Sequence, residues 1–438
     1  MKKVSVGLTM LAVLLMAGSV YGGTYYRGGS LQDPVLVQTD TIDGTSAYRD
    51  FGGIGFYDVL NGSPDPNDHT TWYDWADWTT DWGNELGGFT GPAAEIPPHG
   101  FNVRNDSIMY IKPGTEINTI WVDEEGHTHK ERIRVGYWQG QRYNAGGYGV
   151  IHIGLDPGDN LFDPSDDIVE TDPSNTTVTA GYIRVGLWNW WTDNSPITVP
   201  TNENYTYSNA DNQPPCVIWQ HGGTVTTEVL DLGRGEGGIG PASDDKKSGY
   251  GIYIVSGNSV LTETYNGITL GTCKDTDDAK VRGIFWIKGD QATISAAEYQ
   301  SSEYSTTRIE LTADATITPI EVHPKWWHTG ELDNTIKGTL WVDSSAGAPA
   351  VGTKVTVLTI DEGSDPTKTC EDIKGILDYT ELTIDPNSTI GANGEHWALM
   401  PETAIQEEPC IVAMRIQYIA AVAGDANNDG VVDVADLG

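Results

Sequence analysis

A run of acidic and amide side chains near the end of the chain has the spacing of a calcium-binding loop. The segment GDANNDGVVDVADLG, residues 424–438, places oxygen-bearing residues at regular intervals, and Gly430 permits the sharp turn between them. Because Ca²⁺ prefers roughly six to eight oxygen ligands in proteins, this pattern predicts calcium as a cofactor. The predicted ligands are Asp425, Asn427, Asp429, the backbone carbonyl of Val431, Asp433 and Asp436.

The same segment resembles the first half of a type I dockerin, a module that binds cohesins. The pattern DxNxDGxxDxxDL carries the resemblance, with Asp436 where the usual EF-hand loop has a glutamate. A dockerin contains a second loop of this kind, whereas this chain stops at Gly438, just after the first. We therefore expect a truncated module at 423–438, and cohesin as a partner only where a second loop completes it.

The N-terminus has the features of a secretory signal peptide. Lys2 and Lys3 precede an apolar run from Val4 to Ala17, and small residues follow up to Gly22. The apolar run is too short to cross a hydrocarbon layer of about 30 Å as a helix. We expect residues 1–22 to be removed, leaving a secreted protein, extracellular or attached to the cell surface, without a membrane span.

Composition narrows the class of protein further. Asp and Glu number 62 against 25 Lys and Arg, which gives a formal net charge of −37. Such a chain repels nucleic acid, so we do not expect nucleic acid as a partner. The 52 glycines, together with many Thr and Ser and few helix-like Leu patterns, favour an all-β chain.

Four cysteines in an exported chain are compatible with two disulfides. The most local of the possible pairings joins Cys216 to Cys273 and Cys370 to Cys410, and buried thiols are the alternative.

A loose repeat predicts the fold. Each unit has an apolar strand, a glycine turn, a second strand, and a third strand that ends in Val-Gly or Leu-Gly before a polar loop. Such units cannot bury their own apolar faces, so stacking them predicts a parallel β-solenoid (β-helix) with a small C-terminal β unit. Unequal spacing leaves a β-sandwich or jelly roll as the alternative. The first two strands recur at 109–117, 217–225, 252–260 and 284–293, and the third at 133–138, 183–188, 230–234 and 268–272.

The run VIWQHGGTVTTEVLDLG resembles the coils of secreted bacterial proteins with autotransporter-type β-solenoid repeats. The stretch IKGTLWVDSSAGAPAVGTKVTVLTIDEGS, residues 336–364, resembles their closing segment, which precedes a small β unit and a dockerin-like tail. The resemblance implies a parallel solenoid with a capped end and implies no particular activity. The expected organisation is a signal peptide at 1–22, an N-terminal capping region at 23–105, repeats at 106–320, a terminal coil with a small β unit at 321–422, and the calcium loop at 423–438.

Two groups of tryptophans suggest either packing or carbohydrate binding. The first lies in the N-terminal capping region at helix-like spacing, so it predicts either a helix that covers the end of the solenoid or a platform for sugar rings. The second opens an insertion at 192–215, and insertions on one face of a solenoid often form its binding surface. The first group is Trp72, Trp75, Trp78 and Trp82, and the second is Trp188, Trp190 and Trp191.

Other residues offer weaker candidates. The acidic segment 154–172 predicts either a solvated loop or a second calcium site. A polysaccharide lyase on a β-helix needs a basic proton acceptor, and Arg134, Arg184 and Lys288 fall on strand-like segments without a motif around them.

Three functions are compatible with these observations. We favour a non-catalytic cell-surface or extracellular-matrix protein for adhesion or assembly, because the chain has no recognisable catalytic motif. The second is a carbohydrate-binding protein, for which the tryptophans and the dockerin-like loop are the reasons. The third is a polysaccharide lyase or glycosidase, which needs paired carboxylates, or calcium with a base, in one groove. The expected partners are polysaccharide or other cell-surface proteins.

Overall fold

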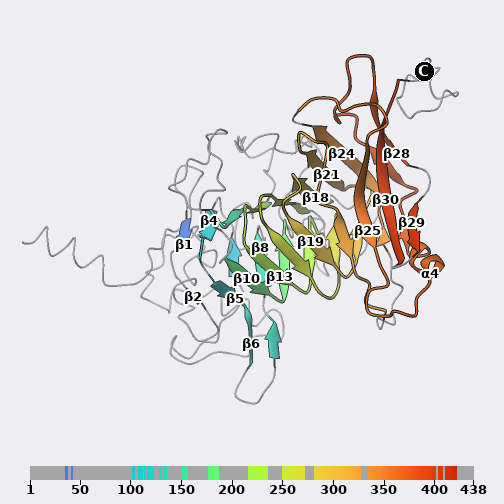
Figure 1. The fold of residues 1–438 in the computed structure, drawn as a ribbon. Helices are drawn as coiled ribbons and strands as arrows, with labels where there is room; N and C mark the ends of the chain where they lie inside the picture. Colours follow the sequence, from blue (N-terminus) through green and yellow to red (C-terminus); the bar gives the residue numbers. More distant parts are fainter. Residues whose placement is uncertain are drawn as a thin grey trace, which may run out of the picture.

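The computed structural model contains a stack of short strands followed by a small C-terminal unit (Figure 1). The predicted calcium loop at 423–438, both tryptophan groups and the signal peptide lie outside the residues that the structure describes. The described residues are 35–37, 41–42, 101–103, 107–111, 113–114, 116–122, 128–130, 132–135, 149–155, 176–186, 216–234, 249–271, 281–326, 334–344, 346–400, 403–407 and 410–421.

Three sheets run along the stack, and each coil contributes one strand to each sheet in turn. Sheet A contains β1 (Val35–Val37), β4 (Ser107–Ile111), β9 (Gly149–Ile153), β12 (Cys216–Gln220), β15 (Gly249–Val255), β18 (Val281–Lys288), β21 (Thr306–Leu311), β24 (Gly338–Ser344) and β27 (Leu382–Ile384). Sheet C contains β3 (Phe101–Val103), β8 (Arg132–Val135), β11 (Tyr182–Val185), β14 (Leu230–Leu232), β17 (Ile268–Leu270) and β20 (Tyr299–Ser301).

Sheet B lies between them along the chain and extends into the C-terminal unit. Its strands are β2 (Thr41–Ile42), β5 (Glu116–Asn118), β10 (Thr177–Ala180), β13 (Thr224–Thr227), β16 (Val260–Glu263), β19 (Thr293–Ala296), β22 (Ile320–Val322), β25 (Lys354–Ile360), β30 (Cys410–Ile419), β28 (His396–Leu399) and β29 (Ala404–Glu407). The remaining described elements are the pairs β6 (Ile120–Val122) with β7 (Thr128–Lys130) and β23 (Asn334–Thr335) with β26 (Leu377–Asp378), and helix α4 (Cys370–Lys374).

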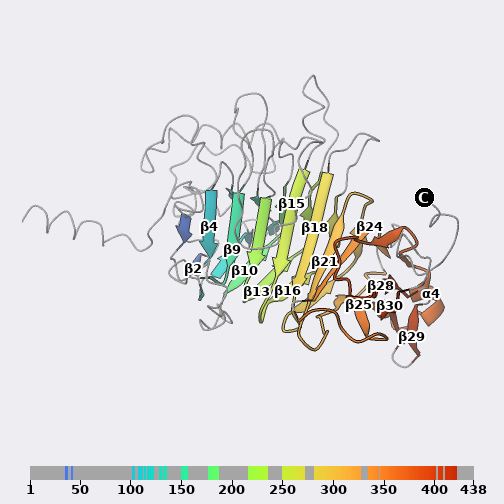
Figure 2. The same cartoon turned by 90° about the horizontal axis from the view of Figure 1, so that it is seen from above.

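The repeats align in register, which confirms the predicted parallel β-solenoid. Ile133 of one third-strand copy pairs with Ile183 of the next, and Val217, Ile252 and Ile284 are partners in successive strands of sheet A. The strands of sheet A lie side by side in Figure 2. A β-sandwich or jelly roll is wrong as the alternative, because those folds are antiparallel and these long sheets pair in parallel within the stack. Strands β1, β2 and β3, which precede residue 106, pair with β4, β5 and β8.

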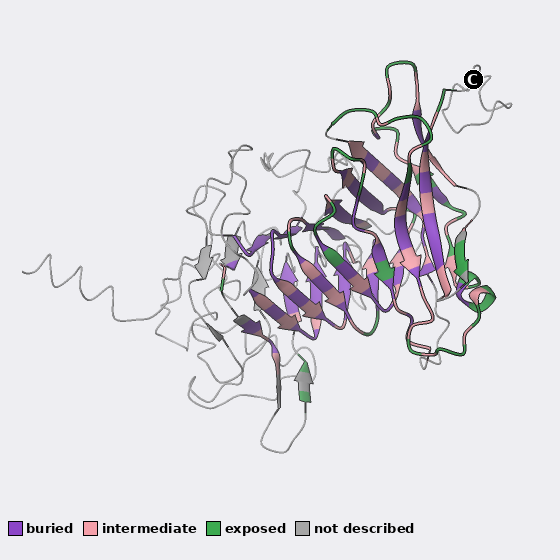
Figure 3. Ribbon diagram, viewed as in Figure 1, coloured by how far each residue is buried: buried purple, intermediate pink, exposed green. Residues whose placement is uncertain are grey.

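Alternation along each strand builds the interior of the stack. On sheet A, Ile218, Tyr253 and Phe285 point into one continuous core that reaches from Ile111 to Tyr418. Alternate residues of a strand face opposite sides of its sheet, so their neighbours Trp219, Ile254 and Trp286 lie on the outer face. These outer residues are nevertheless buried, and Figure 3 shows buried positions along the coils whose burial is described.

Glycines allow neighbouring coils to approach at the corner after sheet C. Gly233, which follows β14, has a φ of +63°, and a Cβ atom there would lie 1.7 Å from the carbonyl oxygen of Arg282 in β18. A side chain would therefore strain its own backbone and meet the next layers of the stack. This close approach and the positive φ explain why a glycine ends the third strand of the repeat.

Connection length varies at this corner and also elsewhere, since 154–176 is a long connection from sheet A to sheet B and 43–100 is a long one from sheet B to sheet C. The turns from sheet A to sheet B at 221–223, 256–259 and 289–292 are short and similar. The later turn from sheet C to sheet A at 302–305 is also short. Earlier coils instead have long segments at this corner. These segments are 136–148, 187–215, 235–248 and 272–280.

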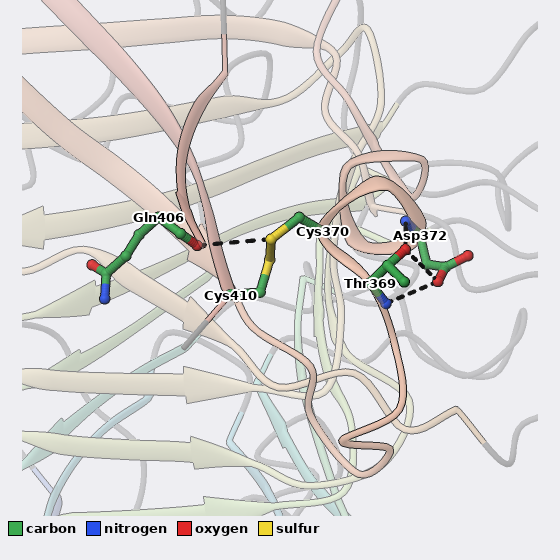
Figure 4. The surroundings of a disulfide bond; sticks show 5 residues. All are labelled: Thr369, Cys370, Asp372, Gln406 and Cys410. Carbon is green, nitrogen blue, oxygen red and sulfur yellow. Dashed lines mark hydrogen bonds between the residues drawn. A yellow bond between two sulfur atoms is a disulfide. The ribbon is translucent and has the colours of Figure 1, made fainter. Parts of the chain in front are cut away.

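The stack ends where strand direction reverses. Strand β25 pairs in parallel with β22 on one side and antiparallel with β30 on the other. Helix α4, capped by Thr369, is tied to the start of β30 by a disulfide between Cys370 and Cys410 (Figure 4). The disulfide confirms the predicted pairing of Cys370 with Cys410. Cys216 is buried in the core, and its predicted partner Cys273 lies outside the described residues.

Helix content in the described part of the chain is low. None of its helices has the length and apolar character that crossing a membrane requires.

Candidate functional site

The outer face of sheet A carries a strip of aromatic and charged side chains that we call the sheet A strip. Parallel pairing places residues from distant parts of the sequence on neighbouring strands, roughly 4.8 Å apart. The strip has two rows, an aromatic row and a more exposed rim. The aromatic row is Trp219, Ile254, Trp286, Arg308 and Trp341, and the rim is Ser256, Lys288, Glu310 and Asp343.

Arg308 is held between two tryptophans of the aromatic row. Its guanidinium carbon lies 3.8 Å from the ring centroid of Trp286 and 4.3 Å from that of Trp341. Its Nε donates to a carboxylate oxygen of Asp343 at 2.9 Å, and Trp341 Nε1 donates to the other oxygen at 2.9 Å. Arg308 is 4% exposed, so its charge is both stacked and paired where water is largely excluded.

Two histidines continue the strip toward the N-terminal coils. His221 stacks on Trp219 with centroids 4.4 Å apart, and its Nε2 lies 2.9 Å from Nδ1 of His152. Burial lowers the pKa of His152 to about 3. Burial, together with the charges of His152 and Lys288, lowers the pKa of His221 well below its ordinary value. Both imidazoles are therefore neutral at pH 7, and one donates its N–H to the other.

The rim contains a cation and a carboxylate that are less tightly paired. Lys288 Nζ lies 4.8 Å from the ring centroid of Trp219 and 5.2 Å from that of Trp286. Its distance to Oε2 of Glu310 is 4.0 Å, which is too long for a hydrogen bond. The Lys288 and Glu310 side chains are 25% and 30% exposed, so a solute can reach this part of the strip.

These features favour binding over proton transfer at the strip. The neutral histidines are buried, and Arg308 already holds the carboxylate of Asp343. The faces of the indole rings are covered by cations or by His221, so flat stacking of a sugar ring on Trp286 would have to displace Arg308. The partly exposed donors and acceptors of the rim remain as groups that can hydrogen-bond a solute.

The two arginines considered as lyase bases lie on another face. Arg134 and Arg184 are register partners on the outer side of sheet C, away from Lys288 on sheet A. Arg184 Nε lies 3.0 Å from Oδ2 of Asp231, and the same oxygen accepts from Arg234 at 2.8 Å. The three basic residues considered from the sequence therefore do not meet in one place. Only Lys288 belongs to the sheet A strip.

The predicted metal and tryptophan sites are not placed by the structure. The calcium ligands of the 423–438 loop, the acidic residues of 156–172 and both tryptophan groups lie outside the described residues. Within the described residues, no group of three or more His, Cys, Asp or Glu side chains has the arrangement of a metal site. Calcium binding at the loop stays a prediction.

Sequence reasoning missed the strip itself. Trp219 and Trp286 occupy the same position in VIWQHG and IFWIKG, each three residues before a glycine, and each is followed two residues later by a basic or imidazole side chain. Aligning the repeat units by their glycines was the signal that could have found them. Arg308 and Trp341 have no such motif, and register alone brings them beside Trp286.

Comparison with known proteins gives no relative from which a function can be transferred. No family model matches the chain, and neither a curated protein nor a solved structure is significantly similar to it.

Proposed function

We propose that this chain is a secreted, non-catalytic β-solenoid protein of the cell surface or extracellular matrix, and that it serves adhesion or assembly. The observation that carries this proposal is that the strands stay in register although connections of very unequal length join them, four of these at the corner between sheets C and A. A stack whose strands stay in register while its connections differ in length is suited to presenting those connections from a rigid support. The signal-like N-terminus supports secretion, and the net charge of −37 suits an extracellular protein.

The test replaces the longest connection at the corner between sheets C and A with the shortest one there. A variant in which the four residues 302–305 substitute for 187–215 keeps the strands at both ends of the replaced segment. We expect this variant to melt near the wild-type temperature and to lose retention on isolated cell-surface material. The control shortens 272–280 in the same way. Equal retention of wild type and both variants would contradict the proposal, as would release of new reducing or unsaturated ends from a polysaccharide panel.

We also propose that the 423–438 loop binds calcium and tethers the protein, with cohesin as partner only if a second loop completes the module. Asp429→Ala removes one predicted ligand, so calorimetry should show loss of the calcium site. Asp365→Ala, which removes a partly exposed acid from the turn before α4, is the control. Unchanged calcium affinity in Asp429→Ala would rule out this site.

Carbohydrate binding is the second candidate function, and the sheet A strip favours it. The rim of the strip carries partly exposed hydrogen-bonding groups on neighbouring strands, and such groups can hold sugar hydroxyls. Retention of the purified protein on a polysaccharide without release of new ends would support this candidate.

A further inference from the structure

The sheet A strip contains two ion pairs, and only one of them is joined by direct hydrogen bonds. Arg308 and Asp343 contact each other directly, and Asp343 accepts a further bond from Trp341. Lys288 and Glu310 are 4.0 Å apart, and in the described structure each has a charge partner but no hydrogen bond from its charged group. A gap of this length between two charged groups fits one bridging hydroxyl or water oxygen.

An indole N–H next to this pair also lacks an acceptor. Trp219 Nε1 donates to Ser256 of the next coil at 2.9 Å. By register, the position that corresponds to Ser256 for Trp286 is Glu310, yet Nε1 of Trp286 has no hydrogen-bond partner in the described structure. Trp286 is 3% exposed, and a buried N–H without a partner costs free energy. An ammonium, a carboxylate and an indole N–H therefore share one pair of neighbouring strands.

The charge of the strip selects the class of ligand. Lys288 and Arg308 are balanced by Glu310 and Asp343, so the strip has no net charge in a chain of −37. A polyanion is attracted by Lys288 but repelled by both carboxylates and by the chain as a whole, and a polycation is repelled by both basic groups. A sugar hydroxyl donates and accepts, so it satisfies Lys288 and Glu310 together.

We propose that the sheet A strip binds a linear, uncharged polysaccharide that lies along the rim, parallel to the solenoid axis. This proposal rests on the carbohydrate-binding candidate and names its ligand class and mode of recognition. Hydroxyls bridge Lys288 and Glu310 at the rim, while the indole faces stay covered by the basic side chains. Hydrogen bonds at successive strands, rather than ring stacking, hold the polymer.

The experiment uses the full mature chain and measures its affinity for soluble galactomannan, hydroxyethyl cellulose and polygalacturonate by affinity electrophoresis. At least one of the two uncharged polymers should bind, with little dependence on salt, and the polyanion should not. Lys288→Met and Glu310→Ala should each weaken binding about tenfold, because each removes hydrogen bonds to a charged group. Trp286→Phe should weaken it less.

The matched control is Lys337→Met, which removes a cation paired with Glu381 at 3.0 Å outside the strip and should leave binding unchanged. Thermal unfolding of each variant verifies its fold, and Glu310→Gln replaces any variant that does not fold, with the same expected loss of a charged acceptor. Stronger binding of polygalacturonate would overturn the proposal. Unchanged affinity for an uncharged polymer in the Lys288 and Glu310 variants would also overturn it. That result would retain the carbohydrate-binding function but place it elsewhere on the chain. Retention on none of the polymers would overturn both.

Discussion

The parallel coils and the C-terminal unit bury one continuous core, but they fix their strands by different means. In the coils, each strand pairs with its counterpart in the next coil, and a corner such as Gly233 lets backbone pass close to backbone. In the C-terminal unit, β30 reverses direction against β25, and the disulfide from α4 ties the start of β30 in place.

This difference has consequences for where each region is vulnerable. A coil contacts mainly its neighbours, so a local defect at a corner interrupts the stack at that point. Antiparallel β30 occupies the sheet B edge that another parallel coil would otherwise extend, so this edge of the stack is covered. Changes at a corner glycine test the first region, and changes at the covalent link test the second.

The largest effect is expected for Gly233→Ala. Its Cβ would meet the carbonyl oxygen of Arg282 at 1.7 Å, and φ is +63°, so both crowding and backbone strain oppose the change. We expect a loss of about 4 kcal/mol or more in the free energy of unfolding, measured by denaturant titration. Gly347→Ala in the turn before β25 is the control, because its φ is +89° but nothing lies within 4 Å, so about 1–2 kcal/mol is expected. Equal losses at both sites would show that backbone crowding does not limit the stack.

A second effect, confined to the C-terminal unit, is expected for Cys410→Ser. The disulfide closes a segment with a sequence separation of 40, and the chain-entropy estimate for such a loop is about 4 kcal/mol at most. The measured loss should be smaller than this, because strand pairing of β30 with β25 persists without the link. Hydrogen exchange should show the loss at β29 and α4 and leave the coils around β15 protected. Uniform loss of protection along the chain would instead make the coils and the C-terminal unit a single cooperative block.

The two regions also differ in how far the sequence predicts them. The copies IRVG at 183–186 and 133–136 show the coils because apolar residues alternate and a glycine ends each strand. The disulfide follows from the proximity of its cysteines in the chain. The sequence does not predict the sheet A strip. Trp286, Arg308 and Trp341 are outward residues of separate strands, and in the sequence they look like parts of solvated faces. Connections of unequal length hide the register that makes them neighbours.

The smallest effect concerns a contact between two neighbouring coils at the C-terminal end of the stack. His323 follows β22, and its Nδ1 lies 2.8 Å from Oδ2 of Asp361, which follows β25. The hydrogen bond to Asp361 raises the pKa of His323 despite partial burial. Burial alone would raise the pKa of Asp361, but the bonds from His323 and from the backbone N–H of Gly363 outweigh it and lower that pKa.

These opposite shifts give the contact a window of pH. A raised histidine pKa stabilises the fold below its unfolded value of about 6.5, and this contribution is lost as pH rises through the folded pKa. A lowered aspartate pKa stabilises the fold above an unfolded value of about 3.9 and is lost as pH falls through the folded pKa. The pair therefore contributes most between about pH 4 and 6.5. Because the His323 and Asp361 side chains are 45% and 33% exposed, solvent screening should keep the contribution below about 1 kcal/mol.

The substitution His323→Gln isolates the histidine's contribution to the pH dependence of stability, because the glutamine side chain does not titrate. Unfolding free energies measured from pH 4 to 9 should fall more steeply for wild type than for the variant between about pH 6.5, the unfolded histidine value, and the raised folded pKa, and the two curves should run parallel above it. Cys410→Ser, measured over the same range, tells whether the link between α4 and β30 changes the pH dependence. Parallel curves for wild type and His323→Gln over the whole range would show that this contact contributes no proton-linked stability, and that strand pairing and the shared core alone hold β25 against β22.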